Sequence, residues 1–166
     1  MLFERGNQAE PIRLRRSFSS ARDGLSVRYP ADWRVTTHNE TFVDNPELCF
    51  TLRPSAGKYA RSVAVKLVEY LPPELDRRAL VDRDPITHEP MYAHRPAHFR
   101  LSMLQPPDND WTRGDTLDFQ DHGRVFFVGV DLPRRANGST KRTVESVLDS
   151  IKVGAGRCRP SSGVGS

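Results

Sequence analysis

The chain has 166 residues, enough for about one domain, with 37% hydrophobic and 28% charged residues and a mean hydropathy of −0.59. No stretch approaches the roughly 18–20 consecutive apolar residues of a membrane-spanning helix. Two cysteines are too few for a disulfide-rich scaffold. The composition therefore predicts one water-soluble domain without a membrane span, and it indicates no particular activity.

The positive charge is concentrated at the two ends of the chain. The formal charge is +4 and the sequence pI is about 9.4. Residues 1–22 carry +3 and residues 154–166 carry +2, which leaves −1 for residues 23–153. We therefore expect a flexible basic arm over 1–22, one folded domain over 23–153 and a disordered Gly/Ser tail over 154–166. Nucleic acid is not the favoured partner, and binding through the arm is the alternative.

The first half of the domain has the patterns of β-strands. Residues 24–29 alternate between apolar and polar, and Pro30 stops that strand before Trp33 and Val35 continue an apolar face. Residues 49–53 form a second short strand between two prolines. Residues 62–71 are apolar at nearly every position, which is typical of a central strand covered on both faces.

The middle of the chain is rich in proline. Pro72 and Pro73 precede a short predicted helix over Glu74–Arg83, and residues 84–96 are predicted as a loop. Residues 97–104 alternate again and predict a strand. Its inward side chains would be Phe99, Leu101 and Met103.

The last third predicts a hairpin followed by an amphipathic helix. Two strands, residues 116–120 and 123–132, flank Asp121-His122, and Gly123 is free to take a positive φ. Residues 139–151 place four apolar side chains on one helical stripe, and Asn137-Gly138-Ser139 supplies the preceding turn and an N-cap. The fold class is therefore α+β, with a mainly antiparallel sheet and the C-terminal helix packed on it.

Three motifs resemble those of one superfamily. A short strand runs into Tyr29-Pro30-Ala31-Asp32-Trp33, a long apolar strand opens on Gly123-Arg124, and the last helix closes on Leu148-Asp149-Ser150-Ile151. Together they resemble motifs of the PsbP-like superfamily, which includes the extrinsic photosystem II subunit, a Ran-binding nuclear import factor and small bacterial proteins. Among these, the sequence is most similar in character to actinobacterial members. Over residues 23–153 the resemblance implies an α/β/α sandwich around a mainly antiparallel sheet of about six strands. It also implies a binding or accessory role without catalytic residues.

The residues themselves offer no catalytic arrangement. There is no nucleophile with an adjacent base, no phosphate-binding glycine loop and no dinucleotide fingerprint. We therefore expect no enzyme activity, no cofactor and no metal. His88, His94 and His98 are the metal-site alternative, but Pro96 prevents a shared helical face, and solvated loop histidines are favoured.

Aromatic residues with arginine in the proline-rich loops indicate a surface for an unidentified protein partner. These residues are Tyr92, Trp111 and Arg113, and exposed aromatics with arginine are typical interface anchors. Burial beneath the loops is the alternative for them. The alternative function is a small enzyme or ligand-binding protein with its site in residues 84–113.

The state of the two cysteines would indicate whether the protein works in an oxidising or a reducing cellular compartment. Cys49 lies in a predicted strand and Cys158 in the tail, 109 positions later. A disulfide would join the tail to the sheet and imply an oxidising compartment, but two unrelated thiols are the favoured interpretation. The N-terminal residues show no apolar signal segment, which predicts a cytoplasmic protein. A truncated N-terminus would leave export open.

Overall fold

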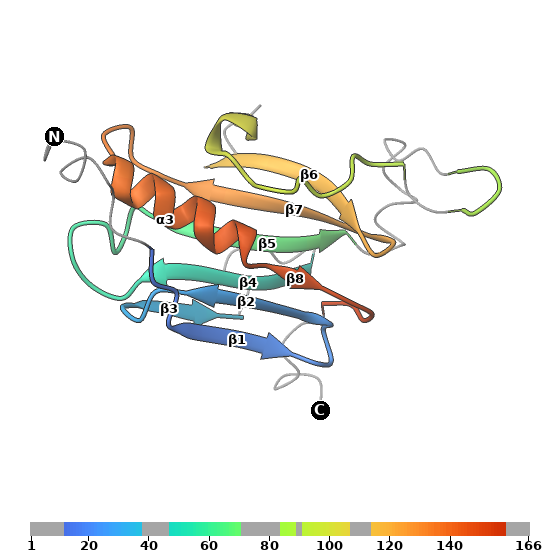
Figure 1. The fold of residues 1–166 in the computed structure, drawn as a ribbon, viewed down its shortest axis with the longest axis horizontal. Helices are drawn as coiled ribbons and strands as arrows, with labels where there is room; N and C mark the ends of the chain where they lie inside the picture. Colours follow the sequence, from blue (N-terminus) through green and yellow to red (C-terminus); the bar gives the residue numbers. More distant parts are fainter. Residues whose placement is uncertain (1–11, 38–46, 71–83, 89–90, 107–113, 159–166) are drawn as a thin grey trace, which may run out of the picture.

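A computed structural model describes residues 12–37, 47–70, 84–88, 91–106 and 114–158. In these ranges eight strands form two antiparallel sheets, and α3 is the one α-helix (Figure 1). The α+β class, the mainly antiparallel strands and the C-terminal helix packed on the sheet are therefore confirmed. The helix expected over 74–83 lies outside the described residues.

The larger sheet has five strands in the order β3-β4-β5-β7-β6, and every neighbouring pair is antiparallel. Its strands are β3 (Trp33–Thr36), β4 (Glu47–Pro54), β5 (Ala64–Tyr70), β6 (Asp115–Asp121) and β7 (Arg124–Asp131). The hairpin between β6 and β7 closes with positive φ at His122 (52°) and Gly123 (71°), the backbone of a type I′ turn. The central strands β5 and β7 are the two that the sequence predicts from nearly continuous apolar runs.

The smaller sheet has the order β1-β2-β8, and it corrects the extent of the expected arm. Its strands are β1 (Arg16–Ser20), β2 (Leu25–Tyr29) and β8 (Lys152–Val153). β1 lies within residues 1–22, yet all five of its residues pair with β2. Its side chains are mostly exposed and polar, and besides the pairing with β2 it is held by Phe18, which packs against Phe50, and by Arg16, which donates to Trp33 O at 3.2 Å.

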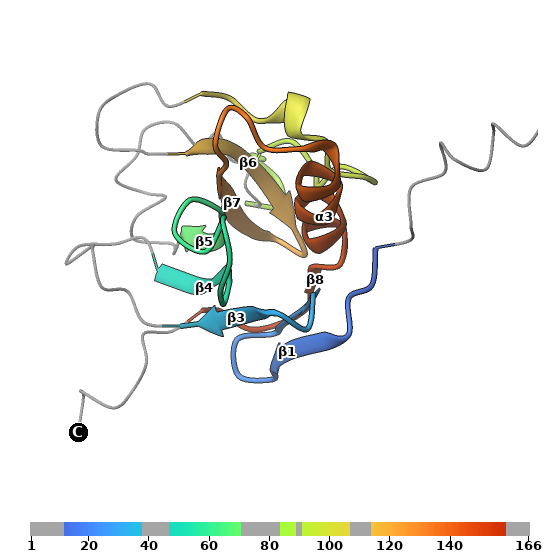
Figure 2. The ribbon, with the colours of Figure 1, turned by 90° about the vertical axis from the view of Figure 1, so that its left-hand side faces the viewer.

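Helix α3 (Gly138–Asp149) lies on one face of the five-stranded sheet (Figure 2). It begins within the expected Asn137-Gly138-Ser139 segment, where Asn137 is the N-cap and its Oδ1 accepts a hydrogen bond from the backbone N–H of Thr140 at 2.8 Å. Its apolar stripe buries Val144, Val147 and Leu148. The chain leaves α3 directly into β8, which places the smaller sheet next to the helix.

The main core lies between the five-stranded sheet on one side and α3 with β2 on the other. Fully buried side chains come from β2, β4, β5, β7 and α3. In that order, examples are Val27, Phe50, Leu67, Phe126 and Val147. Successive strand residues point to opposite faces, so the opposite face of the sheet carries a second cluster. There Tyr70 and Val125 pack with Tyr92 and Phe127.

Residues 97–104 do not form the expected strand. Their described structure is a bend followed by the 3₁₀ helix η1 (Leu101–Met103). Phe99 is fully buried as expected, whereas Met103 is 43% exposed. The physical reason is that carboxylates of α3, and not a neighbouring strand, accept the backbone N–H groups of Phe99 and Leu101.

None of the helices in the described ranges combines the length and the apolar character that crossing a bilayer requires.

Candidate functional site

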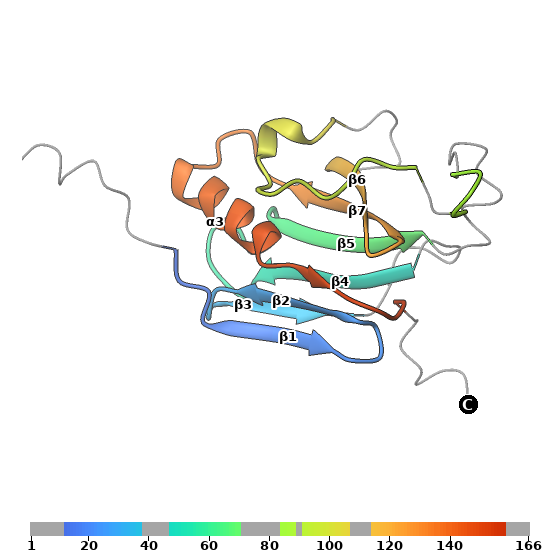
Figure 3. The same cartoon turned by 45° about the vertical axis from the view of Figure 1, so that its right-hand side comes forward.

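Residues 91–106, called the strap below, run along the outer edge of β6 (Figure 3). The backbone of Gln120 exchanges hydrogen bonds of 3.0 and 2.8 Å with the strap. Nearer the other end, Gln105 and Thr116 exchange two more, at 2.8 and 2.9 Å. The strap therefore covers an edge that would otherwise present unpaired backbone groups.

A second set of contacts anchors the strap to the C-terminal end of α3. Asp149 Oδ1 accepts the N–H of Phe99 at 2.6 Å, and Glu145 Oε2 accepts the N–H of Leu101 at 2.9 Å. Arg95 donates to the carbonyl oxygens of the last helical turn at 3.2 and 3.3 Å, where the helix dipole favours a cation. The strap is thus fixed on two sides, by β6 and by the C-terminal end of α3.

The large apolar side chains that are exposed in the described ranges all lie within residues 84–106. Ile86 is 87% exposed, Met91 is 59% exposed and Met103 is 43% exposed. These side chains share one stretch of sequence, but residues 84–88 and the 3₁₀ helix η1 lie near opposite ends of β6 (Figure 1). The stretch overlaps the proline-rich region in which the sequence predicts a partner surface.

Ile86 is displayed on a hydrogen-bonded turn, residues 84–88, called the Asp84 turn below. Asp84 Oδ1 accepts the backbone N–H of Ile86 at 2.7 Å and that of Thr87 at 2.9 Å. These two donors stabilise the carboxylate and hold the pKa of Asp84 below its ordinary value. The backbone N–H of His88 closes the turn on Asp84 O at 2.9 Å.

Of the predicted partner-binding residues, Tyr92 is the one that the structure describes. It is half-buried and packs against the cluster of Tyr70 and Val125, and its carbonyl oxygen accepts a hydrogen bond from the side chain of Gln120. Its aromatic ring therefore supports the strap from beneath. Trp111 and Arg113 lie outside the described residues.

The three histidines of this region, His88, His94 and His98, lie in or next to the strap. His98 Nδ1 lies 3.4 Å from Asp149 Oδ2, next to the anchor of Phe99. His94 forms an isolated bridge with Gln120. His88 takes a positive φ of 61° at the end of the Asp84 turn. None of the three belongs to a group of potential metal ligands among the described residues.

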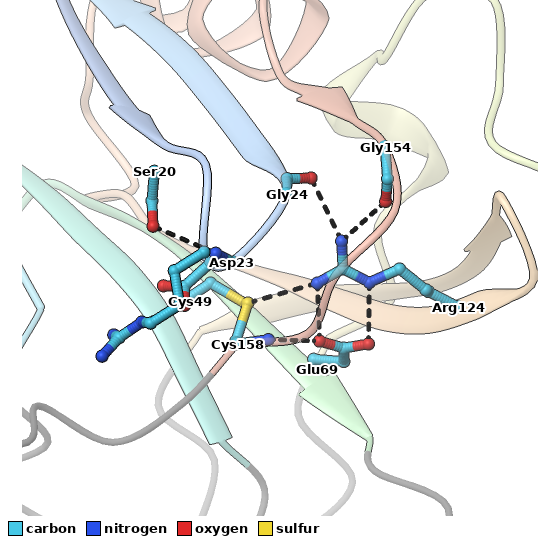
Figure 4. The surroundings of a disulfide bond; sticks show 9 residues. Ser20, Asp23, Gly24, Cys49, Glu69, Arg124, Gly154 and Cys158 are labelled. Carbon is cyan, nitrogen blue, oxygen red and sulfur yellow. Dashed lines mark hydrogen bonds and ion pairs between the residues drawn. A yellow bond between two sulfur atoms is a disulfide. The ribbon is translucent and has the colours of Figure 1, made fainter.

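Cys49 and Cys158 form a disulfide, so the expectation of two unrelated thiols is wrong (Figure 4). Their Cα atoms lie 5.2 Å apart and both side chains are buried. A β-bulge in β4 lets Cys49 and Phe50 both face the core, because the register with β5 shifts between Leu48 and Phe50. Residues 154–158 are therefore attached to the sheet, and the expected disordered tail does not begin at 154.

A buried ion pair lies against the disulfide. Arg124 binds both carboxylate oxygens of Glu69, at 2.9 and 2.7 Å. Its remaining N–H groups reach Gly24 O at 3.1 Å, Gly154 O at 2.9 Å and Cys158 Sγ at 3.7 Å. All five guanidinium donors thus have acceptors. Arg124 connects β7 with β5, with the start of β2 and with the segment after β8.

Cys49, Glu69 and Cys158 are the one group of three potential metal ligands in the described ranges. The disulfide uses both sulfur atoms, and Glu69 already accepts from Arg124 and from the backbone N–H of Cys158 at 2.7 Å. The arrangement is therefore a structural connection in its oxidised state. A carboxylate within the apolar run of β5 and an arginine opening the apolar run of β7 are the sequence signals that could have revealed it.

A cavity of about 250 Å³ lies beside the N-terminal end of α3. Trp33 and Tyr59 line it together with Pro30 and Pro54. Its polar lining comes from Asp32, Lys58, Ser139, Thr140 and Thr143. None of its lining residues belongs to 84–113, the region in which the alternative hypothesis places a ligand site.

Comparison with protein-family models, with curated proteins and with solved structures finds no match for this chain.

Proposed function

We propose that the protein is a non-catalytic binding domain that docks a protein partner along the strap and the Asp84 turn. One observation carries the proposal: Ile86, Met91 and Met103, the exposed large apolar side chains of the described ranges, all lie on this one stretch. Burial of a fully exposed isoleucine side chain contributes about 1.5–3 kcal/mol. Ile86 is therefore the anchor of the proposed interface.

The support beneath these side chains favours a docking role. Backbone pairing with β6 and the carboxylates of Glu145 and Asp149 hold the strap in place. A surface that is ordered before binding loses less conformational entropy when a partner arrives. The resemblance to PsbP-like domains, which are mostly binding or accessory proteins, agrees with this role and stays a proposal.

We further propose that the protein works in an oxidising compartment, in place of the cytoplasmic location expected from the sequence. The support is the Cys49–Cys158 disulfide, because such bonds persist outside reducing compartments. Trapping of free thiols in freshly lysed cells tests this directly. We expect both cysteines to be protected from alkylation until a reductant is added. Alkylation of both without reductant would contradict the assignment.

The docking proposal is tested by affinity capture with matched variants. The oxidised full-length protein, the double variant Ile86→Ser/Met91→Ser and the control Ile12→Ser are immobilised and exposed to the same cell extract. Ile12 is a partly exposed isoleucine outside the proposed surface. We expect a protein retained by the wild type and by Ile12→Ser to be lost from the double variant.

The affinity for that retained protein is then measured with the purified partner. Removal of two apolar anchors should raise the dissociation constant at least tenfold, since tenfold corresponds to about 1.4 kcal/mol. Equal melting temperatures of the three proteins show that the substitutions act on binding and not on folding. Equal retention by the double variant and the wild type would refute docking through this surface.

A further inference from the structure

We propose that the outer edge of β1 binds an extended acidic segment of a partner protein, which adds to the smaller sheet as a further strand. β1 stands at the end of the order β1-β2-β8, so one side of its backbone pairs with β2 and the other pairs with no strand of the described residues. A free strand edge presents a row of N–H and C=O groups with which an extended peptide can pair. The inference is independent of the docking proposal, because β1 lies on the opposite side of the molecule from β6 and the strap (Figure 3).

Of the four strands at the ends of the two sheets, β1 offers the longest uncovered edge in the described ranges. The strap covers the edge of β6. β8 has two residues and β3 has four, and short edge strands offer few groups for pairing. Arg16 also donates to Trp33 O on β3 at 3.2 Å. β1 has five residues, and it is the edge that an added strand fits best.

An inward-facing side chain holds β1 in place and leaves its outer face exposed. The ring of Phe18 meets that of Phe50 edge-on, with their centroids 6.4 Å apart. Because successive strand residues point to opposite faces, Ser17 and Ser19 point outward, and both are exposed. Their hydroxyl groups can donate to carboxylates on an added neighbouring strand.

The charge around β1 selects an acidic occupant. Residues 12–37 hold six arginines and two aspartates, a formal charge of +4 that equals the charge of the whole chain. Of the two aspartates, Asp23 is buried and its carboxylate lies 3.0 Å from Arg22, so its charge is already balanced. Part of the positive charge that the sequence predicts on a flexible arm therefore belongs to an ordered strand and the residues next to it.

Exposed arginines directly before β1 extend the same edge. Arg13 and Arg15 are both exposed. Arg28 of β2 donates to Leu14 O at 2.8 Å, which ties this segment to the sheet. A strand with carboxylates on this edge would lie beside these guanidinium groups, and arginine binds a carboxylate through two parallel hydrogen bonds. A second copy of β1 would instead bring like charges together, which is unfavourable between neighbouring strands.

The test measures binding of a short fluorescein-labelled peptide that alternates valine and glutamate to the oxidised full-length protein, by fluorescence anisotropy. Two further peptides carry N-methyl groups on the valines alone or on the glutamates alone, so all three have the same charge. In an added strand only every second N–H points toward β1. We expect saturable binding of the unmethylated peptide and of one methylated peptide, and a dissociation constant about tenfold higher for the other. No saturable binding, or equal dissociation constants for the two methylated peptides, overturns the proposal.

A charge-reversal variant with a matched control locates the site. Arg13→Glu/Arg15→Glu reverses two charges next to β1, and Arg134→Glu/Arg135→Glu reverses two exposed arginines between β7 and α3. Both variants change the net charge of the chain equally. At physiological salt, where charges far from the site are screened, we expect the first variant to raise the dissociation constant of the unmethylated peptide about tenfold and the control to leave it nearly unchanged. An equal loss in both variants, or no loss in the first, with the melting temperature of the wild type overturns the site.

Discussion

Replacement of Arg124 by methionine tests how much the buried ion pair between Arg124 and Glu69 contributes to the stability of the fold. Arg124 and Glu69 are 7% and 4% exposed. Without the guanidinium, the Glu69 carboxylate keeps one donor, the N–H of Cys158, and Gly154 O loses its contact with Arg124. Removal of one partner of a buried ion pair costs about 3–5 kcal/mol. That is a large share of the roughly 5–15 kcal/mol by which a domain is stable.

The measurement is urea unfolding of the oxidised protein, in a double-mutant cycle with Glu69→Met and the double variant Arg124→Met/Glu69→Met. We expect each single variant to lose about 3–5 kcal/mol and the double variant to lose much less than their sum, because it leaves no unpaired buried charge. Arg124→Lys keeps the charge but not the planar fork, so its loss should be intermediate. A loss below about 1 kcal/mol in Arg124→Met, the range of exposed pairs, would refute the reasoning.

Three further predictions concern the segments around this cluster and the proposed surface. The double variant Cys49→Ser/Cys158→Ser removes a disulfide between residues 109 positions apart. Its free energy of unfolding, measured with a chemical denaturant, should be about 2–5 kcal/mol lower than that of the oxidised wild type. An equal denaturation midpoint for the two proteins would contradict this prediction. Gly24 and Gly57 both have positive φ, but a Cβ on Gly24 would lie 2.0 Å from a backbone oxygen, whereas a Cβ on Gly57 would meet nothing within 4 Å. Gly24→Ala should therefore lower the melting temperature clearly more than Gly57→Ala. Equal shifts of the melting temperature would rule out the close approach at Gly24. Two backbone N–H donors lower the pKa of Asp84, so the turn gains stability above the ordinary Asp pKa and loses it as the pH falls through the lowered pKa. The amide NMR shifts of the turn should titrate with a midpoint below that of an unfolded peptide. A midpoint at or above the peptide value would contradict the two hydrogen bonds.

The strands of the main core could be predicted from the sequence because burial imposes a pattern. β2 alternates with period two, and β5 and β7 are nearly continuous apolar runs, as expected for strands covered on both faces. The apolar stripe of α3 and the capping segment Asn137-Gly138-Ser139 can also be predicted from the sequence. In each case the local sequence and the tertiary environment favour the same structure.

The elements that could not be predicted depend on partners distant in sequence. β1 has a polar sequence, and it becomes a strand through its pairing with β2. The strap alternates like a strand, yet carboxylates about 45–50 positions later bind its N–H groups. The disulfide joins residues separated by 109 positions, and no spacing rule predicts such a pair from two cysteines.

The residues of the proposed surface differ from those that the sequence predicts. The exposed large apolar side chains of the described residues lie within residues 84–106, whereas the sequence predicts Tyr92, Trp111 and Arg113 as partner-binding residues. An exposed isoleucine was not expected as its most prominent feature, because isoleucine is usually buried. The Asp84 turn explains this exposure: its hydrogen bonds fix the backbone locally, so the turn does not require burial of Ile86 to be ordered.

Hydrogen–deuterium exchange of the oxidised protein, free and bound to its captured partner, tests the docking proposal most directly. Local protection from exchange reports which backbone segments a partner covers or stabilises. We predict that added protection is concentrated in residues 84–106, and that it disappears when Ile86→Ser/Met91→Ser replaces the wild type. Protection confined to other segments, with residues 84–106 exchanging as in the free protein, would contradict the account.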